Sequence, residues 1–288
     1  MQSKPLIVVV GETASGKSAL AMELAHQFGG EIVCADSWTV YTGFDIGTAK
    51  PSKTDREEIP HHLLDVASPS EGFSVAVFKA QAQLAIENIL SRGKLPILAG
   101  GAGLYIDSVL YDYGFLEQPD PIERKKLDAM DLQALLEYAQ ELGLSLAGID
   151  VRNRRRVCRH IENRGERPTK KMLRHETLIL GLRIPRSELT QRIETRVDAM
   201  LKNGLEDEVR ELAKRYGWNA EPMKGIGYRE WREYFEGSQD LALTRQRIIQ
   251  GNTQLARKQR TWFKRNNSIQ WVSSRSKAVD LVTTFLNN

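Results

Sequence analysis

The chain has 288 residues, of which 41% are hydrophobic and 27% charged, proportions that are ordinary for a globular protein. It has no apolar stretch long enough to cross a bilayer and no apolar segment of the signal-peptide type, which argues against a membrane protein and predicts a cytoplasmic location. Its two cysteines, Cys34 and Cys158, are too few to indicate a disulfide framework or a zinc site.

The first predicted element is a buried strand over residues 5–10, followed by Gly-Glu-Thr-Ala-Ser-Gly-Lys-Ser at 11–18 and a helical pattern to Phe28. This is the phosphate-binding-loop pattern, in which glycines let successive backbone N–H groups point at one anion. Lys17 adds a positive charge, and the Ser18 hydroxyl is placed to bind a Mg²⁺ carried by the phosphates. The residues predicted to bind a phosphate ester are Gly11, Thr13, Ala14, Ser15, Gly16, Lys17 and Ser18.

Further strands are predicted at 31–35, 95–99 and 178–182, and helices at 73–92 and 186–216. The strands are too apolar to be half exposed, so their alternation with helices predicts a parallel sheet covered on both faces. The predicted fold class is α/β, with a P-loop NTPase-like parallel sheet as its core. Ligands of such sheets bind beyond the carboxyl ends of the strands, at the loops 11–18, 36–50 and 100–104.

Residues 115–175 interrupt this pattern. Pro119 and Pro121 break the chain, and two short amphipathic helices are then predicted over 131–142 and 153–163. We interpret this segment as a small helical insertion domain.

The net charge of +4 is unevenly distributed. Residues 1–114 carry 8 Lys and Arg against 13 Asp and Glu, whereas residues 115–288 carry 33 against 24. The density is highest at 152–174, where 10 basic residues face only two acidic ones. A basic run is more often a solvated face than a binding site, but nucleic-acid binding needs this density and a fold does not. Charge alone leaves both interpretations open.

Polar residues follow two of the predicted strands. Asp36 begins the segment Asp-Ser-Trp-Thr-Val-Tyr, where a carboxylate could act as a general base, hold magnesium or only cap a turn. Gly-Gly-Ala-Gly at 100–103 repeats the strand–turn–helix arrangement and predicts a second cluster of backbone donors. His61 and His62 are weak metal candidates because no third ligand stands at helical spacing.

Taken together, these segments resemble the bacterial tRNA dimethylallyltransferases. The matching motifs follow one another along most of the chain: residues 11–18, Asp36-Ser37 to Val40-Tyr41, Asp-Ile-Gly-Thr-Ala-Lys-Pro at 45–51, Pro-His-His-Leu at 60–63, Gly-Gly-Ala-Gly-Leu-Tyr-Ile at 100–106, Arg155-Arg156 with Arg159, Gly225 to Tyr228, and Ala-Arg-Lys-Gln at 256–259 leading into Trp262 and Phe263. No isolated motif could imitate this ordered set, although the insertion is short for the family.

The resemblance implies an enzyme that transfers a dimethylallyl group from dimethylallyl diphosphate to N6 of adenosine 37, beside the anticodon of tRNAs that read UNN codons. It implies that Lys17 and the phosphate-binding loop, with Lys224 and a Mg²⁺ cofactor on Ser18, stabilise the diphosphate leaving group, and that Asp36 is the base. The residues implied to bind tRNA are Asp36, Ser37, Trp38, Thr39, Ala102, Arg155, Arg156, Arg159, Arg257 and Lys258.

The same resemblance divides the chain into a catalytic core, residues 1–114 and 176–288, and a basic tRNA-binding insertion, residues 115–175. Trp262 and Phe263 would offer aromatic rings for stacking on RNA, although Trp262 could equally belong to the core. No coiled-coil or apolar surface pattern indicates more than a monomer.

The chain departs from the family pattern at four positions: Thr39 stands where Gln is usual, Ala102 where Thr is usual, and Lys224 and Gln254 where Arg is usual. The missing hydroxyl at Ala102 removes a hydrogen bond worth about 1 kcal/mol. Lys224 keeps its charge but lacks the bidentate fork of arginine. We expect slower turnover or altered substrate choice, with Lys17, Ser18 and Asp36 intact.

Three alternatives remain at this stage. Prenylation of a free adenine nucleotide uses the same chemistry but has no use for the basic segment. A P-loop kinase of a small metabolite predicts ATP binding and likewise leaves the insertion without a role. A tRNA-binding relative without catalysis is suggested by Thr39, Ala102 and Gln254.

Overall fold

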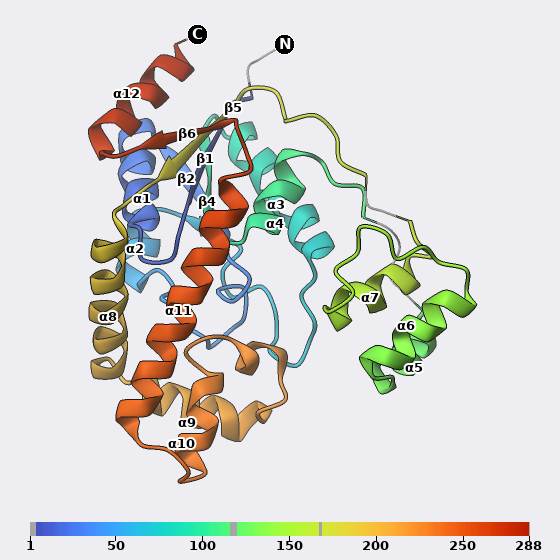
Figure 1. Cartoon of the computed structure of the whole chain (residues 1–288). Helices are drawn as coiled ribbons and strands as arrows, with labels where there is room; N and C mark the ends of the chain where they lie inside the picture. Colours follow the sequence, from blue (N-terminus) through green and yellow to red (C-terminus); the bar gives the residue numbers. More distant parts are fainter. Residues whose placement is uncertain (1–3, 116–119, 167–168, 288) are drawn as a thin grey trace. The chain divides into compact units, whose positions relative to one another are not determined.

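The structure, a computed structural model, describes residues 4–115, 120–166 and 169–287, and its centre is a parallel sheet (Figure 1). Across the described residues the six strands pair in the order β3-β2-β4-β1-β5-β6, and each neighbouring pair is parallel. The strands are β1 (Leu6–Gly11), β2 (Gly30–Ala35), β3 (His61–His62), β4 (Leu95–Gly100), β5 (Thr177–Leu182) and β6 (Ile269–Val272). The predicted α/β fold class is confirmed.

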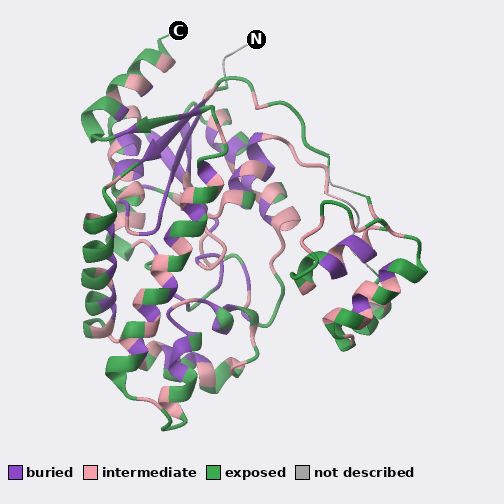
Figure 2. Cartoon of the chain, in the orientation of Figure 1, coloured by how far each residue is buried: buried purple, intermediate pink, exposed green. Residues whose placement is uncertain are grey.

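Helices bury both faces of the sheet, because the crossover connections between parallel strands place helices there. Every residue of β1 and β2 is buried, and Figure 2 shows this burial along the length of the central strands. One face packs on α1 (Lys17–Phe28) and α12 (Arg275–Leu286), and α3 (Val75–Ser91) contacts β2 and β4. Strands buried on both faces must be apolar throughout, which is the pattern of β1.

The remaining elements lie along the chain as follows: α2 (Lys53–Glu58), α4 (Gly103–Leu110), α5 (Pro121–Ala129), α6 (Leu132–Glu141), α7 (Arg154–Glu162), α8 (Arg186–Lys202), α9 (Leu205–Tyr216), the 3₁₀ turns η1 (Glu221–Lys224) and η2 (Arg229–Trp231), α10 (Arg232–Phe235) and α11 (Leu241–Phe263). The strand predicted at 178–182 is β5, which returns to pair with β1.

The single helix predicted over 186–216 is wrong, because the structure has two helices there. Gly204 has φ 93°, a left-handed conformation that favours glycine, and it separates α8 from α9. The apolar residues Leu189, Ile193 and Val197 of α8 keep their periodicity up to this break, so periodicity alone did not reveal it.

The chain forms two compact units. One runs up to Leu110 and resumes at Leu173, and the other is Tyr111–Met172. The sequence placed the insertion at residues 115–175, a few residues further along at both ends. In the larger unit a second core lies beside the sheet, and it gathers Val40, Phe44 and Trp231 with the inner faces of α8 and α9.

The smaller unit has a core of its own, formed by α5, α6 and α7. Six buried residues make this core: Leu127, Leu135, Ala139, Val157, Cys158 and Ile161. The positions Val157 and Ile161 are those expected from the apolar seam of the 153–163 segment. A bridge between Gly114 and Thr169 joins the two chain segments at the base of this unit.

An ion-pair network fastens the edge of the sheet. Glu31 of β2 lies 2.8 Å from His62 Nε2 and is bound by the Arg92 guanidinium. The hydrogen bond from Arg92 lowers the pKa of Glu31 from 4.5 to about 2. A carboxylate whose pKa is lowered by folding stabilises the fold above its unfolded pKa, and this stability is lost as the pH falls from about 4.5 towards 2.

We expect Glu31→Gln to lower the free energy of unfolding by about 1–3 kcal/mol at neutral pH, because the carboxylate that Arg92 binds is lost. The exposure of Arg92 keeps this loss small, because water screens part of its charge. Urea unfolding at several pH values measures this difference, which should shrink below pH 4.5. Glu57→Gln, on the exposed face of α2, is the control. An unchanged difference at low pH would contradict the role of the Glu31 charge.

Candidate active site

The phosphate-binding loop connects β1 to α1. Ala14 has φ 61° and Gly16 has φ 93°, two left-handed conformations that bend the loop in the way typical of anion-binding backbone. A Cβ on Gly11 would lie 2.7 Å from Ser15 Oγ, so a larger residue there would displace the Ser15 side chain. The first N–H groups of α1, beginning at Lys17, have no acceptor within the helix. The loop therefore has the geometry of an anion site.

Lys17 lies inside this loop. Its Nζ is 3.3 Å from the carbonyl oxygen of Glu12. Burial lowers the pKa of Lys17 to about 8, the nearby Arg196 lowers it as well, and Asp36 opposes both. The lysine, the arginine and the aspartate thus interact electrostatically within one site.

Arg196 is the main site residue that the sequence reasoning missed. It projects from α8, donates to Thr13 Oγ1 at 3.1 Å and lies 3.4 Å from the carbonyl oxygen of Thr48. Its buried Nε has no hydrogen-bond partner among the described residues. Burial lowers its pKa and Asp36 raises it. A desolvated guanidinium with a free donor beside a phosphate-binding loop is suited to a multiply charged anion.

One turn before it, Arg192 also reaches the loop. Its Nη1 lies 3.3 Å from the carbonyl oxygen of Ser15, and its Nη2 lies 2.6 Å from Glu188. Arg192 and Arg196 both border a shallow, open hollow on this face of α8. The only sequence signal for these residues was their four-residue spacing on a helix already assigned to the core.

Asp36 begins the loop after β2, as predicted. Its Oδ1 accepts the N–H of Trp38 at 2.9 Å, so the carboxylate caps this turn as well as facing Lys17 and Arg196. The position of Asp36 is therefore compatible with the cap and with the two chemical roles that the sequence left open, general base and magnesium ligand.

The neighbours of Asp36 differ in accessibility. Ser37 and Trp38 are half-buried, and the Trp38 ring lies against Gly225, where a Cβ would be 3.3 Å from it. Thr39 is buried, and its hydroxyl has no partner among the described residues.

The turn after β4 lies next to β1 and β2. Gly100 packs directly on the backbone of Ala35, and the N–H of Ala102 donates to the carbonyl oxygen of Ala35 at 3.2 Å. Ala102 is half-buried and precedes α4. Since β1, β2 and β4 are adjacent, the loops after these three strands meet at one edge of the sheet.

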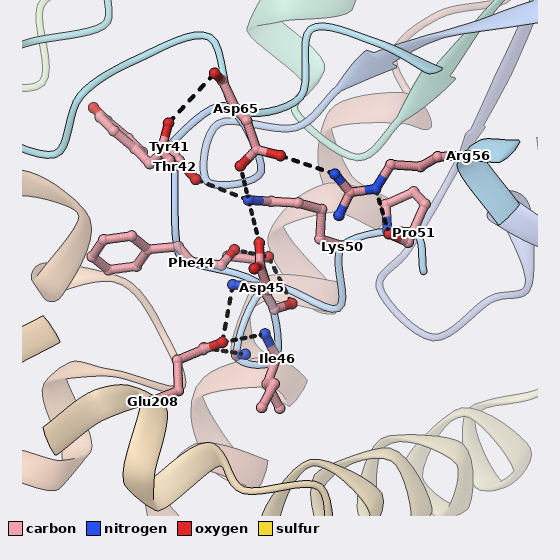
Figure 3. Close-up of polar contacts among 12 residues, drawn as sticks. Tyr41, Thr42, Phe44, Asp45, Ile46, Lys50, Pro51, Arg56, Asp65 and Glu208 are labelled. Carbon is pink, nitrogen blue, oxygen red and sulfur yellow. Dashed lines mark hydrogen bonds and ion pairs between the residues drawn. The ribbon is translucent and has the colours of Figure 1, made fainter. Parts of the chain in front are cut away.

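The segment 45–51 is bound by the protein itself rather than open to a ligand (Figure 3). The N–H groups of Asp45, Ile46 and Gly47 lie 2.7–3.1 Å from the carboxylate of Glu208. Lys50 has a fully buried side chain whose Nζ lies 2.6 Å from both Asp45 and Asp65. These contacts fix the shape of the segment, and the ion pairs neutralise the charges of Lys50 and Asp45 within the protein.

Other predicted residues lie outside the phosphate-binding loop. Lys224 is exposed, and its Nζ is 3.0 Å from Glu221. Arg257 and Lys258 are exposed on α11. Gln254 lines a separate cavity of about 300 Å³ between α11 and the segment around η2.

The arginines of α7 are of two kinds. Arg155 and Arg156 are exposed, while Arg159 lies 3.1 Å from Glu162, whose side chain is buried. Arg154 donates to the carbonyl oxygens of Leu127, Asp128 and Met130 and holds α7 against α5. The exposed pair is therefore free of the packing role that Arg154 and Arg159 carry.

The aromatic residues near the end of α11 are largely structural. Phe263 is 2% exposed, so the expectation that it is available for stacking on RNA is wrong. Trp262 is half-buried, packs on Gly103 and donates from Nε1 to Asp107 at 3.0 Å. The sequence could not predict these contacts of Trp262, because α4 and α11 are far apart in the chain.

The donor set for Mg²⁺ is small. Within the described residues, no group of three or more His, Cys, Asp or Glu side chains could hold a metal ion. Ser18 is exposed on the first turn of α1, where its hydroxyl could supply one ligand. Mg²⁺ usually keeps several waters and binds through substrate phosphates, so one hydroxyl beside an anion site fits it.

Within the described residues no helix has both the length and the apolar character needed to cross a membrane.

Residues 39–266 match the sequence profile of the family described as IPP transferase. A tRNA dimethylallyltransferase of Staphylococcus haemolyticus is 38% identical over an alignment 310 positions long, which covers 99% of this chain and 93% of that protein.

Solved structures are similar over the same length. The full-length tRNA isopentenylpyrophosphate transferase of Bacillus halodurans is 32% identical, with a TM-score of 0.76 and coverage of 99% of this chain and 96% of that one. A eukaryotic dimethylallyltransferase acting on tRNA is 25% identical, with a TM-score of 0.84 and coverage of 99% and 80%. With the ordered motifs and the phosphate-binding loop in place, these matches show that the chain belongs to the tRNA dimethylallyltransferase (IPP transferase) family.

Proposed function

We propose that this protein transfers a dimethylallyl group from dimethylallyl diphosphate to N6 of adenosine 37 in tRNAs that read UNN codons. The observation that carries the proposal is the phosphate-binding loop with Lys17 in it and Arg196 bonded to its Thr13. Asp36 follows strand β2 and affects the pKa of both cations. Two cations on a phosphate-binding loop suit a diphosphate, and a carboxylate beside them suits an amine that must lose a proton. Membership of the family, whose relatives are named for this activity, supports it.

The reaction breaks the bond between carbon 1 of the allyl group and the diphosphate oxygen and forms a bond from that carbon to N6. Negative charge grows on the leaving oxygen, where Lys17, the N–H groups at the start of α1 and the free donor of Arg196 stabilise it. Asp36 accepts the proton that N6 loses. Its cap on Trp38 holds the carboxylate in place for this role.

The diphosphate ligands we propose are the loop residues 11 and 13–18 with Arg196, and Ser18 would hold Mg²⁺. Bound Mg²⁺ would neutralise part of the diphosphate charge. Lys224 would reach the diphosphate only by leaving Glu221, so we assign it a secondary role. Ser37, Trp38, Thr39 and Ala102 border Asp36 and the neighbouring turn, and we propose that they surround the target adenine, which must leave its stack.

We also propose that the exposed arginines of the smaller unit bind the tRNA backbone, together with Arg257 and Lys258 of the larger unit. Cations that are not engaged within the protein can neutralise phosphates, and Arg155 and Arg156 are the best placed of their helix. That the protein is a cytoplasmic monomer stays a prediction.

The pH dependence of diphosphate binding tests the role of Lys17. Because the protonated amine binds the anion and its pKa is about 8, affinity for inorganic diphosphate should fall as the pH rises through this value. Lys17→Met should bind more weakly at neutral pH and lose this decline. Calorimetric titration measures binding by both proteins across the same pH range. The ionisation of diphosphate itself is common to both and cancels in the comparison. Parallel pH profiles for the two would contradict the assignment.

Salt dependence tests the arginines of the smaller unit. Replacing Arg155 and Arg156 together by Ala should weaken tRNA binding and reduce the slope of log affinity against log salt by roughly 1–2 units. Lys53→Ala with Lys94→Ala, two exposed lysines of the larger unit, is the control with equal charge change. An unchanged slope in the arginine variant would make this helix face a solvated surface only.

The activity itself is tested by incubating radiolabelled dimethylallyl diphosphate with unmodified tRNA and AMP as competing acceptors. Label in tRNA, and none in a transcript with guanosine in place of adenosine 37, supports the proposal. Label in AMP would move the function to a free nucleotide. Absence of label despite tight tRNA binding would identify a relative that binds without catalysis.

A further inference from the structure

Gln259 of α11 bridges two of the loops that form the candidate active site. Its Oε1 accepts the N–H of Thr13 in the phosphate-binding loop at 2.7 Å. Its Nε2 donates to the carbonyl oxygen of Gly101, in the turn after β4, at 3.1 Å. Both contacts are buried, and Gln259 is only 8% exposed. One side chain thus satisfies backbone groups of two strands' loops at once.

The bridge is closely packed. A Cβ on Gly101 would overlap Gln259 Nε2, so glycine is needed at that position for the amide to approach. Thr13 is held from a second side as well, since its hydroxyl accepts from Arg196 at 3.1 Å. The amide of Gln259 and the guanidinium of Arg196 therefore fix the same loop residue from two helices.

Two neighbours on α11 reinforce the bridge. Arg260 forms an ion pair with Glu12, which is 7% exposed and precedes Thr13. Trp262 donates to Asp107 of α4. The end of α11 thus contacts the loop after β1 and the helix after β4 through successive residues, and Gln259 is the member that joins the two loops directly.

We propose that Gln259 is a positioning residue that sets the distance between the phosphate-binding loop and the Gly100–Gly103 turn. In terms of the proposed function, on which this inference rests, the first loop holds the diphosphate and the turn borders the acceptor base. Because the leaving oxygen and N6 must lie on opposite sides of one carbon atom, a change in this separation costs rate even when each substrate still binds.

A glutamine is needed because the bridge both accepts and donates. Methionine has a similar size but makes neither hydrogen bond, so Gln259→Met removes the bridge while keeping most of the packing. An ionised glutamate accepts from Thr13 but cannot donate to Gly101. It also places a carboxylate oxygen against the carbonyl oxygen of Gly101, where the amide of Gln259 donates.

The test compares Gln259→Met and Gln259→Glu with Gln246→Met and Gln246→Glu, which make the same changes at an exposed position of α11. We expect kcat of Gln259→Met to fall by about tenfold or more, with KM for tRNA within about twofold. Gln259→Glu, which lacks the donor to the Gly101 carbonyl oxygen, should show a comparable loss of kcat near pH 7.5. Thermal unfolding confirms that the variants are folded.

Two results would overturn the proposal: folded Gln259→Met with the kcat of Gln246→Met, or folded Gln259→Glu with the kcat of Gln246→Glu. If the wild type transfers no label, the proposed function has failed, and amide hydrogen exchange at Thr13, whose N–H is bound by Gln259, decides the inference by itself. Exchange that is faster in Gln259→Met than in Gln246→Met upholds the positioning role, and equal exchange overturns it.

Discussion

Asp36→Asn should lower the rate of dimethylallyl transfer by about 10²- to 10⁴-fold while leaving tRNA affinity within a few-fold. Asparagine still offers an oxygen to the N–H of Trp38, so the turn after β2 is kept and only the proton acceptor is lost. Single-turnover transfer and filter binding measure the two quantities on the same protein.

Asp240→Asn provides the matched control. Asp240 caps α11 by accepting the N–H of Leu243 at 2.7 Å, a role that asparagine performs equally well. Wild-type turnover is therefore expected in this variant. Turnover of Asp36→Asn within tenfold of wild type would show that another group takes the N6 proton.

Arg196→Gln should reduce transfer by about 10²- to 10³-fold, the usual cost of removing one preorganised donor from a developing anion. We expect weaker binding of inorganic diphosphate as well, since the guanidinium charge acts on the bound ground state. Arg186→Gln, at the exposed start of the same helix, controls for the loss of positive charge. Equal rates in the two variants would remove Arg196 from the diphosphate site.

Asp36→Asn and Arg196→Gln should also shift the pH dependence of diphosphate binding in opposite directions. Arg196 lowers the pKa of Lys17 and Asp36 raises it. Without Arg196 the lysine keeps its proton to a higher pH, and without Asp36 it loses the proton at a lower pH. Opposite shifts of the binding midpoint are difficult to produce by general damage to the fold, so this sign test distinguishes electrostatic roles from loss of structure.

The sequence predicted those parts of the site whose cause is local. The phosphate-binding loop follows from glycine spacing between one strand and one helix, and Asp36 follows from its place after a buried strand. The break at Gly204 was missed because the apolar period of α8 continues up to it. The strand β3, with two residues, is too short to have a periodicity.

Arg196 and Gln259 could not be predicted because their roles depend on tertiary packing. Each sits on a long amphipathic helix, and nothing in the local pattern distinguishes it from a surface or core residue. Their partners Thr13 and Gly101 are far away in the chain, and only the folded sheet brings them together. The assignment of Lys224 to the diphosphate rested on the resemblance alone and stays a prediction; in the structure its Nζ forms an exposed ion pair with Glu221.

The order of synthesis gives the split core a further significance. β1 is flanked by β4 and β5, and β5 ends at Leu182, after the whole of the smaller unit. During translation, one edge of the strand that carries the phosphate-binding loop therefore stays unpaired until the insertion has been made. The smaller unit, with its own core, can fold in that interval, and we expect the loop to acquire its final shape only after α8 and α11 have emerged. Anion binding by nascent chains should accordingly begin late, once Gln259 has left the ribosome.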